Sequence, residues 1–215
     1  PKCNFLAASA PRSGVRLQQL QEIQRILHTH NMRKYVNDCV FSPNPITVSV
    51  DETWNYDIKM YEDIVVESGA TLTISCTVRM PDNARIIVER GAKLILDGGS
   101  ITNACEPDPA NNITGMWGGI QVWGGNTQTH LSNNTGQLIS PAELLGTGAG
   151  SYPQALTDHG VVVLTNSARL ENAVTAISTK NQGGDATFHG GIVYAEDSEF
   201  LNNGRAIIRN LLFWG

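Results

Sequence analysis

The feature that most constrains the fold of this chain is an internal repeat with an offset of 22 residues. Residues Val65–Ile74 align with Ile87–Leu96, and five of the ten aligned positions are identical. A propeller blade needs about 40 residues, so this repeat is too short for one. A β-sandwich does not repeat its sequence. The repeat length fits one coil of a three-sided solenoid made of short strands and turns.

A second repeat, further along the chain, has an offset of 30 residues. It aligns Val162–Leu164 with Ile192–Tyr194, and Ala168–Leu170 with Ser198–Phe200. The longer offset is explained by a loop at about Ser178–His189, inserted into a coil of ordinary length. Solenoids accept such insertions in the loops between their strands.

Burial of apolar side chains explains why these repeats should stack. Each coil presents inward-facing Val, Ile and Leu side chains that a single coil cannot bury, and stacking buries them while parallel strands pair between coils. Gly69 and Gly91 permit sharp corners between strands. Asn172 and Asn202 fall one coil apart, which predicts a ladder of stacked side-chain amides. The predicted fold class is all-β: a right-handed parallel β-helix (solenoid) preceded by one amphipathic N-terminal helix.

The sequence divides into two parts at the Ser42–Pro45 breaker. Residues 1–41 are expected to form an irregular segment followed by a helix over Arg16–Val36, where apolar residues recur at three- and four-residue spacing. Residues 42–215 are assigned to the β-helix. We expect it to be truncated at its C-terminal end, because Leu211–Gly215 is an apolar run without a polar cap.

Charge and hydropathy narrow the classes of partner. The net charge of −5 argues against nucleic acid or an anionic membrane surface. No apolar run approaches the roughly 18 residues that a membrane-spanning helix needs, so no membrane insertion is expected. We expect the partners to be other domains of the parent protein or surface proteins, with a polysaccharide left open. The expected location is secreted or cell-surface.

Four cysteines in an exported chain allow three disulfide pairings. The predicted pairs are Cys76 with Cys105 and Cys3 with Cys39, because each pair lies within one local segment. The alternative is a set of free thiols, since free cysteines are often buried in protein cores.

Several stretches carry a resemblance to a known class of domain. They are Ala70–Cys76, Met80-Pro81, Gly91–Gly99 and Trp117–Gly124. Over residues 46–210 the chain resembles right-handed parallel β-helix domains of large bacterial secreted and cell-surface proteins, many of them cargo of the type IX secretion system. The resemblance implies a surface or stalk module rather than the catalytic part of the parent protein.

The N-terminal segment carries a different resemblance. Cys3–Ser9 followed by the expected helix resembles the tail of a pappalysin-type zinc peptidase, in which a Met-turn precedes a closing helix. Leu6 stands where that family has the turn methionine, and the zinc-binding motif His-Glu-x-x-His is absent from this chain. Any peptidase activity would reside upstream, so no catalytic residue is carried over. Alternatively, the helix caps the open end of the solenoid.

Two histidines are candidate metal ligands. His159 and His189 each precede a glycine, and the 30-residue offset would stack them on adjacent coils, with Asp158 and Asp185 nearby. Two imidazoles and a carboxylate can hold a metal ion. The alternative is that both histidines close the turn that enters a strand. We predict no resident cofactor, and calcium is left open.

Aromatic residues are candidates for sugar binding. Trp117, Trp123 and Tyr152 would form a stacking platform, and the two tryptophans lie six residues apart in a glycine-rich strand, where they could share a face. The alternative is that they pack against a neighbouring loop. The stretch Asn126–Tyr152, rich in Asn, Thr, Gly and Ser, is the most loop-like part of the chain and the best place for a binding surface.

The acidic residues bear on catalysis. A glycoside hydrolase needs two carboxylates facing one groove, whereas Asp57, Asp63, Asp97 and Asp197 are scattered. No catalytic residue is predicted, and we expect a non-catalytic β-helix module that acts as a rigid scaffold or adhesion segment. One alternative is a carbohydrate-active β-helix enzyme, a polysaccharide lyase or hydrolase that uses a basic residue such as Arg169. The other is the C-terminal part of a secreted zinc peptidase.

Overall fold

A computed structural model describes residues 42–105, 107, 114–125, 144, 158–179 and 190–208. The chain divides into two compact units, Pro1–Asp38 and Cys39–Gly215, and every described residue belongs to the second. The helix expected in the N-terminal segment lies outside the described residues. None of the helical residues that the structure describes belongs to a segment long and apolar enough to cross a membrane.

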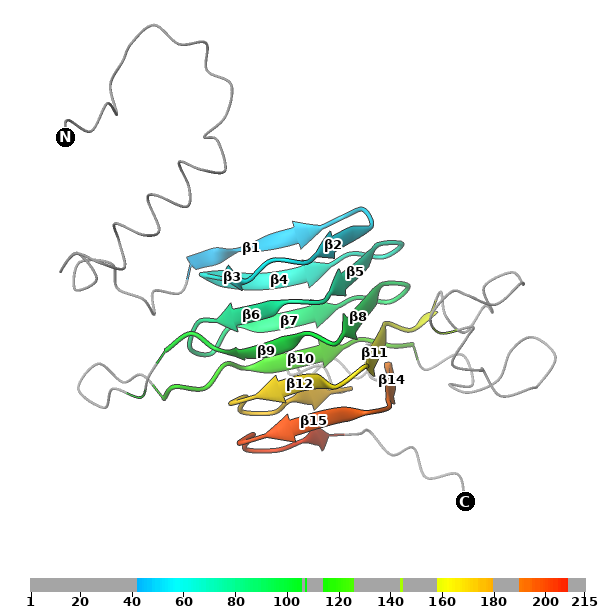
Figure 1. Cartoon of the computed structure of the whole chain (residues 1–215). Helices are drawn as coiled ribbons and strands as arrows, with labels where there is room; N and C mark the ends of the chain where they lie inside the picture. The colour runs from blue at the N-terminus through cyan, green and yellow to red at the C-terminus, as the bar shows by residue number, and fades with distance from the viewer. Residues whose placement is uncertain are drawn as a thin grey trace, which may run out of the picture. The chain divides into compact units, whose positions relative to one another are not determined.

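Sixteen strands in the described residues form three parallel sheets (Figure 1). Sheet A has the order β1-β4-β7-β10-β13-β16, with bounds Ser42–Val48, Glu62–Val66, Arg85–Val88, Gly119–Val122, Ile177–Ser178 and Ile207–Ile208. Sheet B has the order β2-β5-β8-β11-β14, with bounds Glu52–Trp54, Thr71–Ile74, Lys93–Asp97, Val161–Thr165 and Ile192–Ala195. Sheet C has the order β3-β6-β9-β12-β15, with bounds Ile58–Lys59, Thr77–Met80, Arg85-preceding strands aside, Ser100–Asn103, Ala168–Glu171 and Ser198–Leu201.

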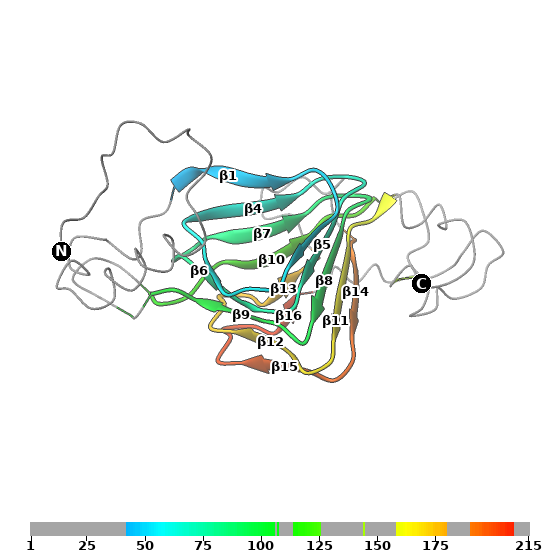
Figure 2. The same cartoon turned by 45° about the horizontal axis from the view of Figure 1, so that its top comes forward.

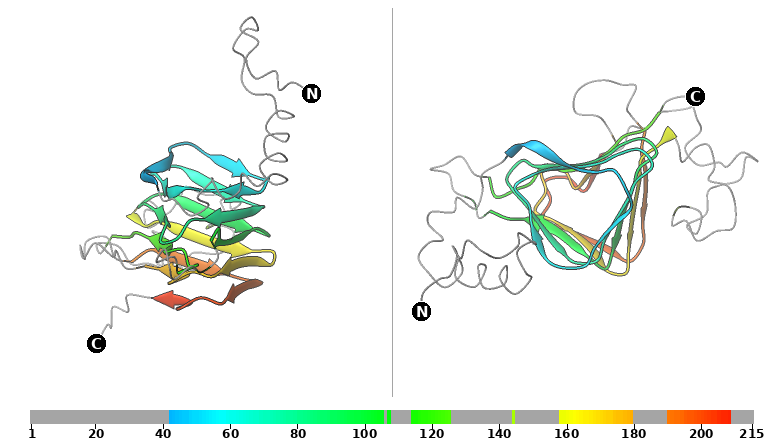
Figure 3. Two further views of the ribbon diagram at one scale, coloured as in Figure 1. Left: turned by 90° about the vertical axis from the view of Figure 1, so that its left-hand side faces the viewer. Right: turned by 90° about the horizontal axis from the view of Figure 1, so that it is seen from above.

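The chain visits the three sheets in a fixed rotation. It passes from sheet A to sheet B to sheet C and then returns to sheet A, one strand further along. Figure 2 shows the strands stacked as successive rungs, and the view from above in Figure 3 shows them superimposed on a triangular outline. The all-β, solenoid-like prediction is therefore confirmed, and the three parallel sheets are compatible with a parallel β-helix.

The 22-residue repeat corresponds to one circuit of the chain. Ile64 pairs with Ile86 between β4 and β7, and Leu72 pairs with Leu94 between β5 and β8. Both pairs have the offset that the sequence predicts. Equivalent side chains therefore lie directly above one another on successive rungs.

The 30-residue repeat is confirmed in sheet C but is wrong by one residue in sheet B. Ala168 pairs with Ser198 as predicted, whereas Val162 pairs with Val193 rather than with Ile192. A shift of one residue moves a side chain to the opposite face of a sheet. The sequence could not fix this register, because Val161–Leu164 is apolar on both faces and shows no alternation.

The interior is built from columns of aliphatic residues that run across the rungs. In sheet A one column consists entirely of isoleucines, and its members are Ile46, Ile64, Ile86, Ile120, Ile177 and Ile207. A parallel column consists entirely of valines, and its members are Val48, Val66, Val88 and Val122. The four inner isoleucines and all four valines are fully buried. β-Branched side chains pack well on such pleated surfaces.

Asparagine side chains stabilise the corners between sheets. Asn172 and Asn202 occupy equivalent corners and both have a left-handed backbone, with φ of 56° and 52°. The Asn172 amide donates to Asn103 Oδ1 at 2.7 Å and to Thr102 Oγ1 at 3.1 Å on the preceding rung. The ladder bond therefore joins Asn172 to Asn103, and the predicted bond to Asn202 is replaced by it.

Ile86 and Ile87 offer a matched test of this architecture, because they are adjacent, chemically identical and on opposite faces of β7. Ile86 is fully buried in the isoleucine column, whereas Ile87 is half-buried on the outer face. We expect Ile86→Ala to lower the free energy of unfolding by about 3 kcal/mol and Ile87→Ala by about 1 kcal/mol, since only the first leaves a cavity between rungs. Urea denaturation measures both values. Equal losses would contradict the assignment of faces.

Candidate functional site

The tryptophans predicted to stack on sugars occupy different environments. Trp117 is fully buried, and its Nε1 donates to the backbone carbonyl of Glu171 at 2.7 Å. Its ring belongs to the core and is not available to a ligand. Trp123 is half-buried directly after β10. Tyr152 lies outside the described residues.

The histidine predicted as a metal ligand lies at a tightly packed corner. His159 is fully buried, and its Nδ1 accepts the backbone N–H of Gly125 at 3.3 Å. This bond places the imidazole proton of the neutral ring on Nε2. The Asp158 carboxylate lies 3.7 Å from the Arg90 guanidinium. A Cβ at Gly125 would come within 2.0 Å of Asp158 Oδ2, so only glycine fits there.

This corner holds only half of the predicted metal site. His159 and Asp158 are described, whereas His189 and Asp185 lie outside the described residues. Among the residues that the structure describes, no three His, Cys, Asp or Glu side chains come close enough to hold a metal ion. The four-residue site stays a prediction.

The structure overturns one predicted disulfide. Cys76 is a free cysteine, so the pairing of Cys76 with Cys105 is wrong. Cys76 lies at the corner between β5 and β6, whereas Cys105 follows β9 and is buried. Closeness in the sequence was a poor guide, because each circuit of the chain carries residues through three sheets. Cys3 and Cys39 lie outside the described residues.

The Cys76 thiol has a perturbed acidity. Partial burial raises its pKa, and the nearby Asp57 carboxylate raises it further because it opposes a second negative charge. Hydrogen bonds with the backbone at Tyr56 and at Cys76 itself act in the opposite direction. The net effect keeps the thiol protonated to a higher pH than an ordinary cysteine.

Three aspartates of the first rung act as backbone acceptors, one on each side of the triangle. Asp51 accepts the N–H of Thr71 at 2.8 Å, and Asp57 accepts the N–H of Thr77 at 2.9 Å. In sheet A, Asp63 accepts the N–H of the first residue of β7 at 2.7 Å. Each carboxylate caps the first residue of the strand one rung below. These acids therefore have a structural use that the sequence did not reveal.

Asp82 is the most extensively bonded carboxylate in the described residues. It is 8% exposed, and its Oδ1 accepts the Thr114 hydroxyl at 2.7 Å, the Thr114 N–H at 3.1 Å and the Met116 N–H at 3.3 Å. Its Oδ2 accepts the Asn83 amide at 2.6 Å. The side chain fixes the point where the chain returns from the connection between β9 and β10. Its role is structural.

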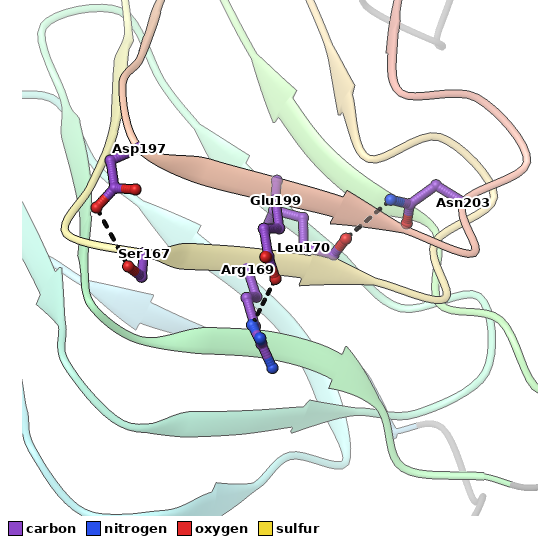
Figure 4. Close-up of polar contacts among 6 residues, drawn as sticks. All are labelled: Ser167, Arg169, Leu170, Asp197, Glu199 and Asn203. Atoms are coloured by element: carbon purple, nitrogen blue, oxygen red, sulfur yellow. Dashed lines mark hydrogen bonds and ion pairs between the residues drawn. The ribbon is translucent and has the colours of Figure 1, made fainter.

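The lower part of the outer face of sheet C carries paired charges (Figure 4). Arg169 and Glu199 are register partners on β12 and β15, and their side chains form an ion pair at 2.8 Å. At the preceding corner the Ser167 hydroxyl donates to Asp197 at 3.1 Å. Opposite charges on neighbouring rungs thus satisfy one another.

The upper part of the same face carries like charges. Lys59 and Arg79 are register partners on β3 and β6, and Arg79 is exposed. The Lys59 ammonium lies 5.9 Å from the centre of the Tyr61 ring. Tyr56 and Tyr61, at the two ends of β3, are 66% and 42% exposed. We call these four residues the tyrosine–cation surface.

Sequence reasoning missed this surface, although a signal was present. Lys59 and Arg79 are 20 residues apart, and the same offset joins Asp57 to Thr77. The first circuit is therefore two residues shorter than the repeat of 22, and no sequence identity marks it. Without the three-dimensional register, the two cations appear unrelated.

The outer face of sheet B is apolar and covered. Val161, Val163 and Ile192 are buried there, and Leu144 packs against them. Ile95 and Tyr194 extend the cluster to neighbouring strands. Leu144 comes from the long connection between β10 and β11, which the sequence identified as the best place for a binding surface. At Leu144 at least, that connection contributes a core residue.

Comparison with known proteins gives no family for this chain. No protein-family model matches it, and neither a curated protein nor a solved structure does. The function must therefore be argued from the residues described above.

Removing the Asp82 carboxylate should release the connection that it holds. We expect Asp82→Ala to lower the free energy of unfolding by about 2 kcal/mol, because it leaves buried donors of Thr114 and Met116 without an acceptor. Hydrogen exchange should show faster exchange at the Met116 amide. Asp51→Ala is the control, because this exposed carboxylate has one backbone donor and its loss should cost less. Unchanged protection of Met116 would contradict the role of Asp82.

The raised pKa of Cys76 predicts slow alkylation. At neutral pH the Cys76 thiol should react with iodoacetamide more slowly than an ordinary cysteine, because less of it is thiolate. Asp57→Asn should shift the pH profile of alkylation to lower pH, since it removes a repelling charge and keeps an acceptor for Thr77. Mass spectrometry of the Cys76 peptide measures the rate. A profile that does not move would show that Asp57 has no influence.

Proposed function

We propose that residues 42–215 are a right-handed parallel β-helix module that serves as a non-catalytic, rigid scaffold or adhesion segment of a larger secreted or cell-surface protein. The proposal agrees with the resemblance to bacterial surface β-helix domains stated above. It includes other domains of the parent protein or surface proteins as partners.

The observation that carries this proposal is the use of the aspartates. All seven aspartates in the described residues have a hydrogen-bond or ion-pair partner within the protein: Asp51, Asp57, Asp63, Asp82, Asp97, Asp158 and Asp197. A hydrolase needs carboxylates that face the substrate and exchange protons with it. Carboxylates that hold the backbone of a neighbouring rung are poorly suited to that task.

The side-chain columns support the mechanical part of the proposal. Each rung buries its isoleucine and valine against the rung above and the rung below. Backbone hydrogen bonds run along the same direction between the strands. A solenoid held in this way resists bending and stretching along its axis, and such resistance is what a spacer or stalk requires.

The proposal is tested by looking for catalysis. We expect no release of reducing ends or unsaturated products when the protein is incubated with polygalacturonate, alginate or neutral glucans, with or without calcium. Size-exclusion chromatography of the polymers and ultraviolet absorbance measure the products.

The variants Asp57→Asn and Asp63→Asn separate true activity from contamination. Cleavage that disappears in either variant, with the fold intact by circular dichroism, would replace the scaffold proposal with the polysaccharide lyase or hydrolase. Cleavage that persists unchanged in both variants and after heat denaturation would be a contaminant.

A further inference from the structure

The tyrosine–cation surface has an unbalanced charge in a fold that otherwise pairs its charges. Lys59 and Arg79 are adjacent in register, and Arg79 forms no ion pair with any described residue. Like charges at adjacent positions on neighbouring strands are destabilising. Four rungs of sheet C thus carry a built-in contrast, because Arg169 and Glu199 pair on the same face.

The nearby acids do not balance these cations. Asp57 lies two residues before Lys59, and its carboxylate accepts the backbone N–H of Thr77. Glu171, on the same face, lies two rungs below Arg79. Rungs are about 4.8 Å apart, so this separation is about 10 Å, comparable to the screening length at physiological salt. The upper face of sheet C therefore attracts an anion.

The two tyrosines make the surface suitable for more than a simple ion. Both rings are exposed although exposed aromatic rings lose the benefit of burial. They stand at the two ends of β3, five residues apart, which is about 16 Å along an extended strand. An aromatic face offers an apolar platform for the C–H face of a sugar ring. The surface thus combines two platforms with a central pair of cations.

We propose that the tyrosine–cation surface binds an acidic polysaccharide, with sugar rings on Tyr56 and Tyr61 and a carboxylate or sulfate between Lys59 and Arg79. An extended polymer matches an extended strip, whereas a single small anion would not use both tyrosines. The site differs from the predicted Trp117–Trp123 platform. It adds a ligand to the proposed scaffold and rests on that function only in requiring binding without cleavage.

Affinity electrophoresis and isothermal titration of the full chain test this proposal. The probes are polygalacturonate and chondroitin sulfate, with dextran as the neutral polymer. We expect binding to both acidic polymers, none to dextran, and weaker binding as sodium chloride is raised. Absence of binding to both acidic polymers at low salt would overturn the site.

Substitutions on the surface identify the residues involved. Lys59→Gln combined with Arg79→Gln should weaken binding about tenfold, because two charge contacts are lost. Tyr56→Ala combined with Tyr61→Ala should weaken it about fivefold. Arg169→Gln is the matched control: it removes one exposed cation from the same face, and binding should stay within about twofold of the unchanged protein.

The remaining outcomes each decide the matter. An Arg169→Gln loss equal to that of the double cation variant would show attraction by overall charge and would overturn the site. Equal binding of duplex DNA without any effect of the tyrosine substitutions would overturn the sugar part of the proposal. Polymer cleavage in the same samples would overturn the scaffold function while leaving the binding site in place, so the two failures are distinguishable.

Discussion

The stacking of identical aliphatic side chains between rungs is the interaction on which the rest of the structure depends. Ile64, Ile86 and Ile120 lie one above another in sheet A, and each covers the next. One rung alone would leave these side chains in water, so no rung is stable without its neighbours. Burial of each such side chain contributes about 1.5–3 kcal/mol. The parallel hydrogen bonds between strands follow from the same alignment.

This constraint determines where polar residues can lie. The inward positions are reserved for aliphatic side chains, so polar groups are confined to corners and outer faces. At the corners they are used to satisfy the backbone, as with Asp51 and Asp63 at the first rung and Asn172 lower down. The outer faces are the only places where the described residues can differ without disturbing the stack.

The outer faces do differ, and the differences are where function is to be sought. Sheet B presents an apolar surface covered at Leu144, which joins a second hydrophobic cluster to the fold. Sheet C presents polar and charged side chains, paired at Arg169 and Glu199 and unbalanced at Lys59 and Arg79. A rigid stack holds these outer groups at fixed spacing, which favours recognition of a repetitive ligand.

The sequence by itself determined the repetitive all-β architecture, because the 22-residue offset and the aliphatic spacing are properties of local composition. Only the tertiary structure decided the register of Val162 with Val193, since that strand is apolar on both faces. It likewise left Cys76 free and buried Trp117. Circuits of unequal length bring distant residues together, and their alignment depends on corner geometry that sequence identity does not record.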